Sequence, residues 1–280
     1  MVSVNLTTTR ARWPLCRIAL TSLLMQSHPA DQINLWISKT PFLADSGFTE
    51  DTRLAIFLAE LPAAWRERLE VHWVENTGPY RKLLPALRSA GPNDLVVTAD
   101  DDIFYGRDWL RLLLEADADC AGSGRVVASR VRLQRKNPLG GLTSYLHWPL
   151  ATEAVTLQAG YVVTFGGGAV LTRDAFTEQD LASDAFLELA PTADDLWYSR
   201  LLQRRGLAVQ VVPAALQELH FIEHSRGLKQ HNLPLRHSTW QRLVWRLRDR
   251  PLGYWGLPVC GNDQAFRRLE SYFSQQEQQP

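Results

Sequence analysis

Short apolar segments alternate with amphipathic segments along the first 120 residues, and this alternation constrains the fold more than any other feature. Residues 2–7, 33–38, 69–75 and 94–99 have the length and composition of buried β-strands. Residues 16–26, 51–68, 80–90 and 108–116 carry apolar side chains at helical spacing. Strands that alternate with helices favour right-handed crossovers, so the sequence predicts an α/β fold whose mostly parallel sheet is flanked by helices.

The pattern becomes less regular after Cys120. Residues 125–148 are basic and interrupted by glycine and proline, which predicts irregular structure or a β excursion. Regular structure is expected again at 161–172, in a helix at 193–205 and in a strand at 207–213. We expect one domain over residues 1–239, with halves at about 1–120 and 121–239. An extension over 240–280 is expected to pack on it and to end in disordered, glutamine-rich residues from Gln275 onward.

The composition excludes several classes of protein. The 280 residues include 30 basic and 30 acidic side chains, and this balance argues against a nucleic-acid partner. Cys16, Cys120 and Cys260 are far apart and form no CxxC pair, so neither a disulfide framework nor a thiolate zinc site is expected. The chain starts as a strand and has no segment long and apolar enough to cross a bilayer, so we expect a cytoplasmic protein.

Three consecutive carboxylates, Asp100, Asp101 and Asp102, follow the strand at 94–99. Ligands of open α/β sheets bind at the carboxyl ends of strands. Adjacent carboxylates repel one another unless a cation compensates them, and hard oxygen ligands suit Mg²⁺ or Mn²⁺. In an extended backbone Asp100 and Asp102 would point to the same side and share one ion. The alternative is that solvated aspartates end the strand, with Asp108 as the N-cap of the next helix.

A second acidic pair, Asp194 and Asp195, opens the helix expected at 193–205. Thr192 and Asp195 have the spacing of a capping box, so one carboxylate has a structural alternative. The functional interpretation is that a positioned aspartate takes a proton from an attacking hydroxyl group as a general base. Capping would use only one of the two carboxylates.

Glycines 166–168 and three histidines are weaker signals. Gly166, Gly167 and Gly168 allow close backbone approach or positive φ angles, but they match neither a Walker loop nor a GxGxxG fingerprint, so a plain turn is the alternative. The histidines follow the strand at 207–213 and are candidates for a further metal ligand or a diphosphate contact, although solvated or structural histidines are more common. They are His220, His224 and His231.

Cationic and aromatic residues suggest two kinds of partner. Several cations lie just beyond strand ends, where they could meet a diphosphate or simply face solvent: Arg10, Arg12, Arg81 and Lys82. The tail carries tryptophans among arginines, and these could contact a membrane face or pack in the core: Trp240, Trp245 and Trp255.

Several segments occur in a familiar order. They are Val4-Asn5-Leu6-Thr7-Thr8-Thr9-Arg10, Ser22-Leu23-Leu24 with Gln26, Leu35-Trp36-Ile37-Ser38, Lys82-Leu83-Leu84-Pro85-Ala86-Leu87, Thr98-Ala99-Asp100-Asp101-Asp102, Pro191-Thr192-Ala193-Asp194-Asp195-Leu196-Trp197 and Gly261-Asn262-Asp263-Gln264. As an ordered set over most of the chain, they resemble bacterial family-two-like glycosyltransferases. This resemblance implies a GT-A fold, a nucleotide-diphosphate sugar donor and an inverting transfer to a glycan of a capsule, a lipopolysaccharide or a related surface polymer.

The resemblance also implies roles for individual residues. Asp100 to Asp102 correspond to the cluster that coordinates Mn²⁺ or Mg²⁺, with Asp100 and Asp102 as ligands and His220 or His224 as possible additions. The acidic pair is usually Glu-Asp, so the aspartate at position 194 is a departure, and the base is Asp195 or Asp194. The donor side comprises Thr7, Thr8, Arg10, Ser38, Lys82, Asp100 and Asp101.

The acceptor side is expected to comprise the glycines 166–168 and the stretch 125–157, where the resemblance is weakest. The expected partners are a free or lipid-linked glycan and, peripherally, the inner face of the cytoplasmic membrane. Two alternatives stay open from the sequence. One is a sugar-nucleotide nucleotidyltransferase, although the segment 7–12 lacks the glycines of its usual loop. The other is a catalytically silent subunit that binds a nucleotide or a glycan.

Overall fold

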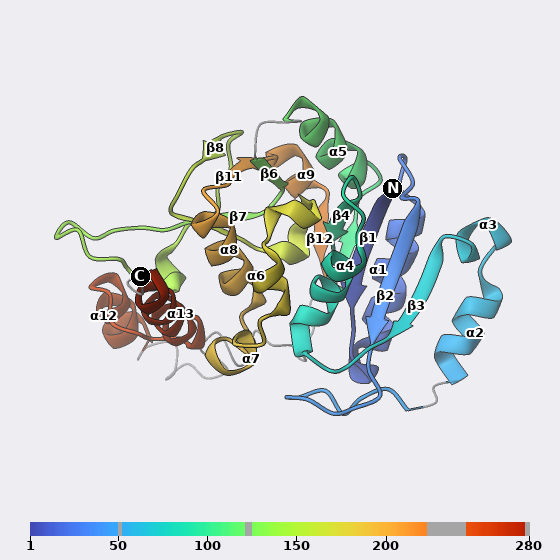
Figure 1. Ribbon diagram of the computed structural model, residues 1–280, viewed down its shortest axis with the longest axis horizontal. Helices are drawn as coiled ribbons and strands as arrows, with labels where there is room; N and C mark the ends of the chain where they lie inside the picture. Colours follow the sequence, from blue (N-terminus) through green and yellow to red (C-terminus); the bar gives the residue numbers. More distant parts are fainter. Residues whose placement is uncertain (50–51, 121–124, 223–244, 278–280) are drawn as a thin grey trace.

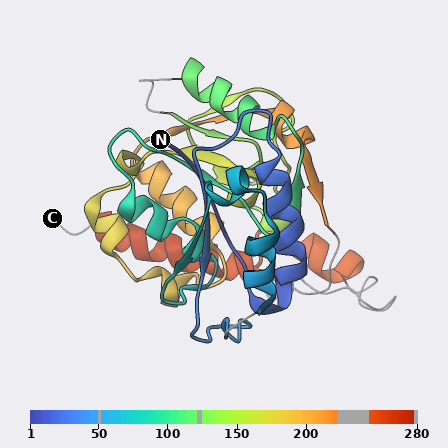
Figure 2. The same ribbon diagram turned by 90° about the vertical axis from the view of Figure 1, so that its right-hand side faces the viewer.

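The computed structural model describes residues 1–49, 52–120, 125–222 and 245–277. An eight-stranded sheet in the order β3-β2-β1-β4-β10-β6-β11-β8 forms its centre, and helices lie on both faces (Figures 1 and 2). All of its strands run in one direction except β10 and β8. The strands are β1 (Val2–Thr7), β2 (Gln32–Ile37), β3 (Leu69–Trp73), β4 (Leu95–Thr98), β6 (Arg125–Ala128), β8 (Thr156–Leu157), β10 (Ala169–Leu171) and β11 (Ala208–Val211). The predicted α/β class with a mostly parallel sheet is confirmed.

Each face of the sheet has its own hydrophobic core, because side chains alternate between the faces along a strand. In β4, Val97 packs with the helices of one face and Val96 with those of the other. The first face is covered by α1 (Trp13–Leu24), α2 (Thr52–Glu60), α5 (Trp109–Asp119) and α9 (Pro213–Gln217). The second is covered by α4 (Leu84–Ser89), α6 (Glu178–Ala182), α7 (Phe186–Leu189), α8 (Asp194–Arg204) and α13 (Gly261–Glu277).

Short elements complete the described chain. Two small antiparallel sheets pair β5 (Ile103–Tyr105) with β12 (Leu219–Phe221) and β7 (Val131–Leu133) with β9 (Tyr161–Val163). The short helical turns are η1 (Arg10–Arg12), α3 (Ala63–Arg66), η2 (Gly78–Lys82), η3 (Tyr145–His147), η4 (Phe165–Gly167), η5 (Arg173–Ala175), η6 (Trp245–Asp249) and α12 (Arg250–Tyr254). None of the helices in the described part of the chain is long and apolar enough to cross a bilayer.

Two predicted helices are each divided at a proline. The helix predicted at 51–68 is replaced by two helices, α2 and α3, and Pro62 is the N-cap of α3. Residues 80–90 form the turn η2 and then α4, which holds Pro85 in its first turn. Proline lacks an N–H group and clashes with the preceding turn, so it is tolerated only where a helix begins. Lys82 is the last residue of η2, two residues before α4 begins.

Residues 125–148 were expected to be irregular or a β excursion, and they contain the strands β6 and β7. β6 is an interior strand of the central sheet and not an excursion from it. β12 is a further strand beyond the last one predicted. The expectation of a disordered tail is wrong for residues 275–277, which belong to α13, while 278–280 lie outside the described residues. Leu269 and Phe273 of α13 are buried against α7 and α8, because their helical spacing gives α13 one apolar face.

Candidate active site

The three aspartates after β4 pair with two cations, Lys82 and Arg12, at the carboxyl edge of the sheet. Asp100 Oδ1 lies 2.7 Å from Lys82 Nζ. Asp101 is buried and accepts hydrogen bonds from Thr8 and Arg12. Asp102 Oδ2 lies 3.1 Å from the same Arg12 guanidinium group. Asp100 and Asp102 therefore pair with different cations, and Arg12 compensates two of the three charges.

Lys82 joins the two acidic motifs of the sequence. Its ammonium group lies 2.7 Å from Asp100 Oδ1 and 3.1 Å from Asp194 Oδ2, and the lysine is only 4% exposed. Burial by itself lowers the pKa of Lys82, but the attraction of Asp100 and Asp194 outweighs it and raises the pKa well above its ordinary value. For Asp100, burial by itself raises the pKa, but the charge of Lys82 outweighs it and holds the pKa of Asp100 below its ordinary value. Lys82 and Asp100 thus form a charged pair, while burial raises the pKa of Asp194.

Asp195 does not close a capping box in this structure. The helix α8 begins at Asp194 with Ala193 as its N-cap, and Asp195 Oδ1 accepts a hydrogen bond from the backbone N–H of Phe165 at 2.9 Å. Burial and then repulsion from Asp194 raise the pKa of Asp195 to about 7. Asp194 is buried beside Lys82, whereas Asp195 is only partly buried. A carboxyl group with a pKa near neutrality can accept a proton at physiological pH.

The glycine turn η4 packs directly against the first aspartate. A Cβ atom on Gly166 would lie 1.9 Å from Asp100 Oδ2, so any other residue here would displace the Asp100 side chain. Tyr105 OH donates to Gly166 O at 2.6 Å and accepts from Asp100 N at 2.7 Å. Gly168 has φ +106°, a conformation that L side chains rarely adopt. The three glycines therefore place the turn between Asp100 and the start of α8.

Three arginines at this edge each contain a buried guanidinium nitrogen without a hydrogen-bond acceptor in the described structure. These nitrogens are Arg12 Nε, Arg81 Nη1 and Arg130 Nε. Arg81 is 2% exposed and pairs with Asp45 at 3.0 Å, so of the two alternatives left by the sequence it does not face solvent. Buried donors that lack an acceptor are costly, so this edge suits an anionic ligand with several oxygen atoms.

The other residues expected at the site have separate partners. Thr7 Oγ1 donates to the carbonyl of Trp36 at 2.7 Å, and Ser38 Oγ hydrogen-bonds with Thr40 Oγ1 at 3.0 Å. Arg10 is exposed. His220 is exposed on β12, with its ring 6.0 Å from that of Phe104. His224, His231 and Trp240 lie outside the described residues.

The acidic cluster by itself does not enclose a metal. Within residues 1–49, 52–120, 125–222 and 245–277, no three His, Cys, Asp or Glu side chains are grouped in a way that could hold one. Mg²⁺ is usually held by one or two carboxylates together with phosphate oxygens, so it needs no dedicated protein cage. Asp100 has a 37% exposed side chain and Asp102 a 17% exposed one, which leaves both available to such a shared ion.

The comparisons with known proteins give structural neighbours only. No family model matches the chain, and no curated protein matches it. The chain is similar to 4-diphosphocytidyl-2C-methyl-D-erythritol synthase from Anaerococcus prevotii, at 14% identity and a TM-score of 0.47, covering 76% of this chain and 86% of that one. It is also similar to residues 1–349 of S. aureus TarS, at 17% identity and a TM-score of 0.48, covering 76% of this chain and 58% of that one. The same TarS fragment in complex with UDP gives 16% identity, a TM-score of 0.48 and coverage of 76% and 57%. Likenesses of this size concern the course of the backbone and assign no activity to this chain.

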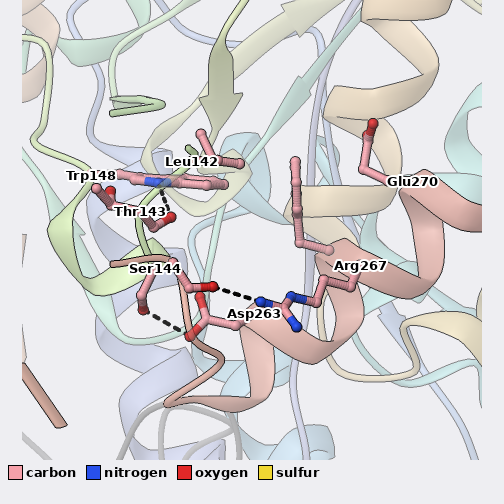
Figure 3. A pocket seen from close by; sticks show the side chains of 9 residues that line it. Leu142, Thr143, Ser144, Trp148, Asp263, Arg267 and Glu270 are labelled. Atoms are coloured by element: carbon pink, nitrogen blue, oxygen red, sulfur yellow. Dashed lines mark hydrogen bonds between the residues drawn. The ribbon is translucent and has the colours of Figure 1, made fainter. Parts of the chain in front are cut away.

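A separate cavity of about 290 Å³ lies between the segment 142–148 and α13 (Figure 3). Leu142, Trp148 and Phe266 give it apolar walls, while Asp263, Arg267 and Glu270 of α13 supply charge. None of the aspartates described above lines it. Tyr145, next to this lining, is buried, and burial first and the Asp195 charge second raise its pKa to about 12.

Some residues of the site carry no signal in the sequence. Asp45, Tyr105 and the backbone N–H of Phe165 enter only through tertiary contacts. Asp45 lies in an irregular segment, and a tyrosine in a short strand looks like an ordinary core residue. The signal that could have found Tyr105 is its place five residues after Asp100, where the chain must turn back toward the aspartates.

Proposed function

We propose that this chain is a GT-A-type glycosyltransferase that moves a sugar from a nucleotide-diphosphate donor to a glycan hydroxyl group. The observation that carries the proposal is the Lys82 bridge, which brings Asp100 after β4 and Asp194 of α8 to one ammonium group. A cluster that pairs carboxylates with buried arginines at the carboxyl edge of a parallel sheet suits a diphosphate and a reacting sugar.

Asp195 is the proposed general base. It would take the proton of the acceptor hydroxyl group as that oxygen attacks the anomeric carbon, while the bond from that carbon to the diphosphate oxygen breaks. Direct displacement of this kind inverts the anomeric carbon. Support comes from the raised pKa of Asp195, about 7, from its partial exposure and from the hydrogen bond that fixes its position. Asp194 has the different role of compensating Lys82.

The arginines are the proposed partners of the leaving diphosphate. Arg12 and Arg81 each have a buried nitrogen without an acceptor, and both lie beside the aspartates or beside Thr8. Thr7, Thr8, Arg10 and Ser38 are proposed to lie along the nucleotide side, as the resemblance implies. Mg²⁺ or Mn²⁺, held by Asp100 and Asp102 together with phosphate oxygens, would supply Lewis-acid stabilisation of the leaving group.

The acceptor is proposed to be a free or lipid-linked glycan of a bacterial surface polymer. The cavity of Figure 3 offers an aromatic wall and three charged side chains, those of Asp263, Arg267 and Glu270, a lining that suits a sugar ring. Part of its lining, Leu142 to Trp148, belongs to the stretch 125–157 in which the acceptor side is expected. Glycines 166–168 are proposed to separate this side from the donor carboxylates.

The decisive experiment is a panel of nucleotide sugars incubated with the purified chain and Mn²⁺ or Mg²⁺, with release of nucleoside diphosphate as the readout. Turnover of one donor, faster when an oligosaccharide acceptor is present, is the expected result. Absence of turnover for all donors with both metals contradicts the proposal. A matched pair of variants, Asp195→Asn and the exposed-site control Asp184→Asn, assigns any activity to this site.

Two rival functions give different products. A sugar-nucleotide nucleotidyltransferase would release pyrophosphate from a nucleoside triphosphate and a sugar phosphate, and this product would replace our proposal. A silent binding subunit would bind a nucleotide in calorimetry with no dependence on metal and would show no transfer. The paired charges of Lys82, Asp100 and Asp194 favour a site that binds a charged ligand and acts on it, over a silent binding subunit.

A further inference from the structure

The end of the molecule that carries α12 exposes several large apolar side chains. Leu247 is 71% exposed, Trp255 55%, Leu257 47% and Leu252 38%. Large apolar side chains exposed together mark interaction sites, whereas isolated ones are normal on any surface. Trp255 was expected from the sequence to pack in the core or to contact a membrane, and its exposure rules out full burial in this fold.

A hairpin at residues 135–143 extends this surface. It closes through pairing of Lys136 with Leu142, and its tip carries Leu139, which is 83% exposed. The hairpin and α12 lie side by side at one end of the molecule, as Figure 1 shows. The Arg135 guanidinium group lies 6.0 Å from the Tyr254 ring centre, and a Cβ atom on Gly256 would lie 2.6 Å from Leu142 O. The two segments therefore form one continuous surface.

The charges of this surface are nearly all positive. Four basic side chains lie among the exposed apolar ones: Arg135, Lys136, Arg248 and Arg250. Asp249 is the one acidic residue within 135–143 and 247–257. Asp249 pairs with Arg248 at 2.8 Å. The whole chain has a formal net charge of zero, so this excess of positive charge is confined to part of the molecule. Arg250 O accepts a hydrogen bond from His147 Nε2 at 2.9 Å, which joins the start of α12 to η3.

We propose that this surface, called the α12 surface, binds the headgroup region of an anionic lipid bilayer. The α12 surface comprises Arg135, Lys136, Leu139, Leu247, Arg248, Arg250, Leu252, Trp255 and Leu257. Tryptophan and leucine enter the boundary between headgroups and acyl chains, while arginine and lysine attract anionic lipids. A protein partner of acidic character would satisfy the arginines but would not require the exposed leucine at a hairpin tip. The inference stands without the proposed transferase activity.

The experiment is sedimentation of the purified full chain with vesicles of phosphatidylcholine alone and vesicles that contain phosphatidylglycerol. We expect binding to the anionic vesicles only, with affinity that falls steeply as salt rises. The double variant Trp255→Ser with Leu257→Ser is expected to weaken binding about tenfold or more. Arg248→Gln with Arg250→Gln is expected to weaken it about fivefold for each charge removed.

Matched controls keep the result specific. Ile56→Ser removes a 54% exposed apolar side chain on α2, and Arg107→Gln removes an exposed charge before α5, so neither should change vesicle binding. Thermal unfolding midpoints close to wild type show that the variants are folded. Equal loss of binding in the controls, or no binding to anionic vesicles, overturns the proposal. A concentration-dependent dimer that the Trp255 and Leu257 changes dissociate also overturns it, because a second copy would then cover the surface.

The two proposals can fail separately. Vesicle binding is measured without any nucleotide sugar, and nucleoside diphosphate release is measured without vesicles. A chain that releases nucleoside diphosphate but ignores anionic vesicles loses only the membrane proposal. A chain that binds the vesicles but releases nothing loses only the transferase proposal.

Discussion

The carboxylate of Asp195 and the backbone N–H of Phe165 form a hydrogen bond of 2.9 Å, which joins the start of α8 to the glycine turn beside Asp100. The bond fixes one carboxylate oxygen of Asp195. A positioned base needs such a constraint, because misplacement of about 1 Å can cost two orders of magnitude in rate. The bond thus gives Asp195 a role that the helix-capping alternative lacks.

Asp195→Asn is expected to lower the turnover of a nucleotide sugar by about 10²- to 10⁴-fold, since an amide cannot take the acceptor proton. The Phe165 N–H still finds an oxygen acceptor in the asparagine, so the fold should be kept. Nucleoside diphosphate release and a thermal unfolding curve measure the two effects. Asp184→Asn, at a 70% exposed side chain, is the control and should behave as wild type. Wild-type turnover in Asp195→Asn would remove this residue from the chemistry.

The pH dependence of the reaction follows from the pKa of Asp195, which burial and Asp194 raise to about 7. The base must be ionised, so kcat/KM is expected to rise with pH and to level off above about 7. Asp194→Asn removes a like charge and strengthens the influence of Lys82, which lowers the pKa of Asp195 and moves the rise to lower pH. Measuring kcat/KM at about ten pH values between pH 5 and pH 9 tests both expectations. An unchanged profile in Asp194→Asn would show that another group titrates.

Lys82→Met is expected to destabilise the fold by about 3 kcal/mol, because it leaves Asp100 and the buried Asp194 without their shared cation. The exposure of Asp100 lets water offset part of the loss. Urea unfolding measures the change, with the exposed Lys136→Met as the control. Adding Asp194→Asn to Lys82→Met should restore part of the stability, since one uncompensated charge is removed. An unfolding free energy equal to wild type would mean that the bridge contributes nothing net.

Gly166→Ala is expected to displace Asp100, since its new Cβ atom would lie 1.9 Å from Asp100 Oδ2. Crowding of this kind typically lowers the free energy of unfolding by about 1–3 kcal/mol. The variant should stay folded and nevertheless lose most of its turnover, because Asp100 is moved. Gly141→Ala is the matched control, since its Cβ atom meets only the Asn137 side chain. Turnover and urea unfolding of both variants decide the matter. Full activity in Gly166→Ala would show that the position of Asp100 is not critical.

Removal of divalent metal with a chelator is expected to abolish turnover, and Mn²⁺ or Mg²⁺ should restore it. Asp102→Ala should then require a higher metal concentration for half-maximal rate, because one of the two proposed carboxylate ligands is gone. Titration of metal against nucleoside diphosphate release gives this value. An Asp102→Ala variant with full metal-dependent turnover at the wild-type metal concentration contradicts the ligand assignment.

Local patterns were sufficient to predict much of the fold. Apolar runs such as that of β4 predict strands buried on both faces, and their alternation with helices predicts a parallel sheet. The same logic placed Asp100 to Asp102 at a strand end. It failed at β6, where glycine and proline nearby suggested irregular structure, because the pairing of β6 with β10 and β11 is non-local.

The amino-acid sequence alone determined the α/β class, the strand end that carries the aspartates and the acidic start of α8, since each depends on spacing within a short segment. Only the tertiary structure decided the partners of these charges. Lys82 meets both Asp100 and Asp194, and Asp195 meets Phe165, through contacts between segments far apart in the chain. Such contacts depend on how the layers pack, and burial then determines which carboxyl groups stay charged.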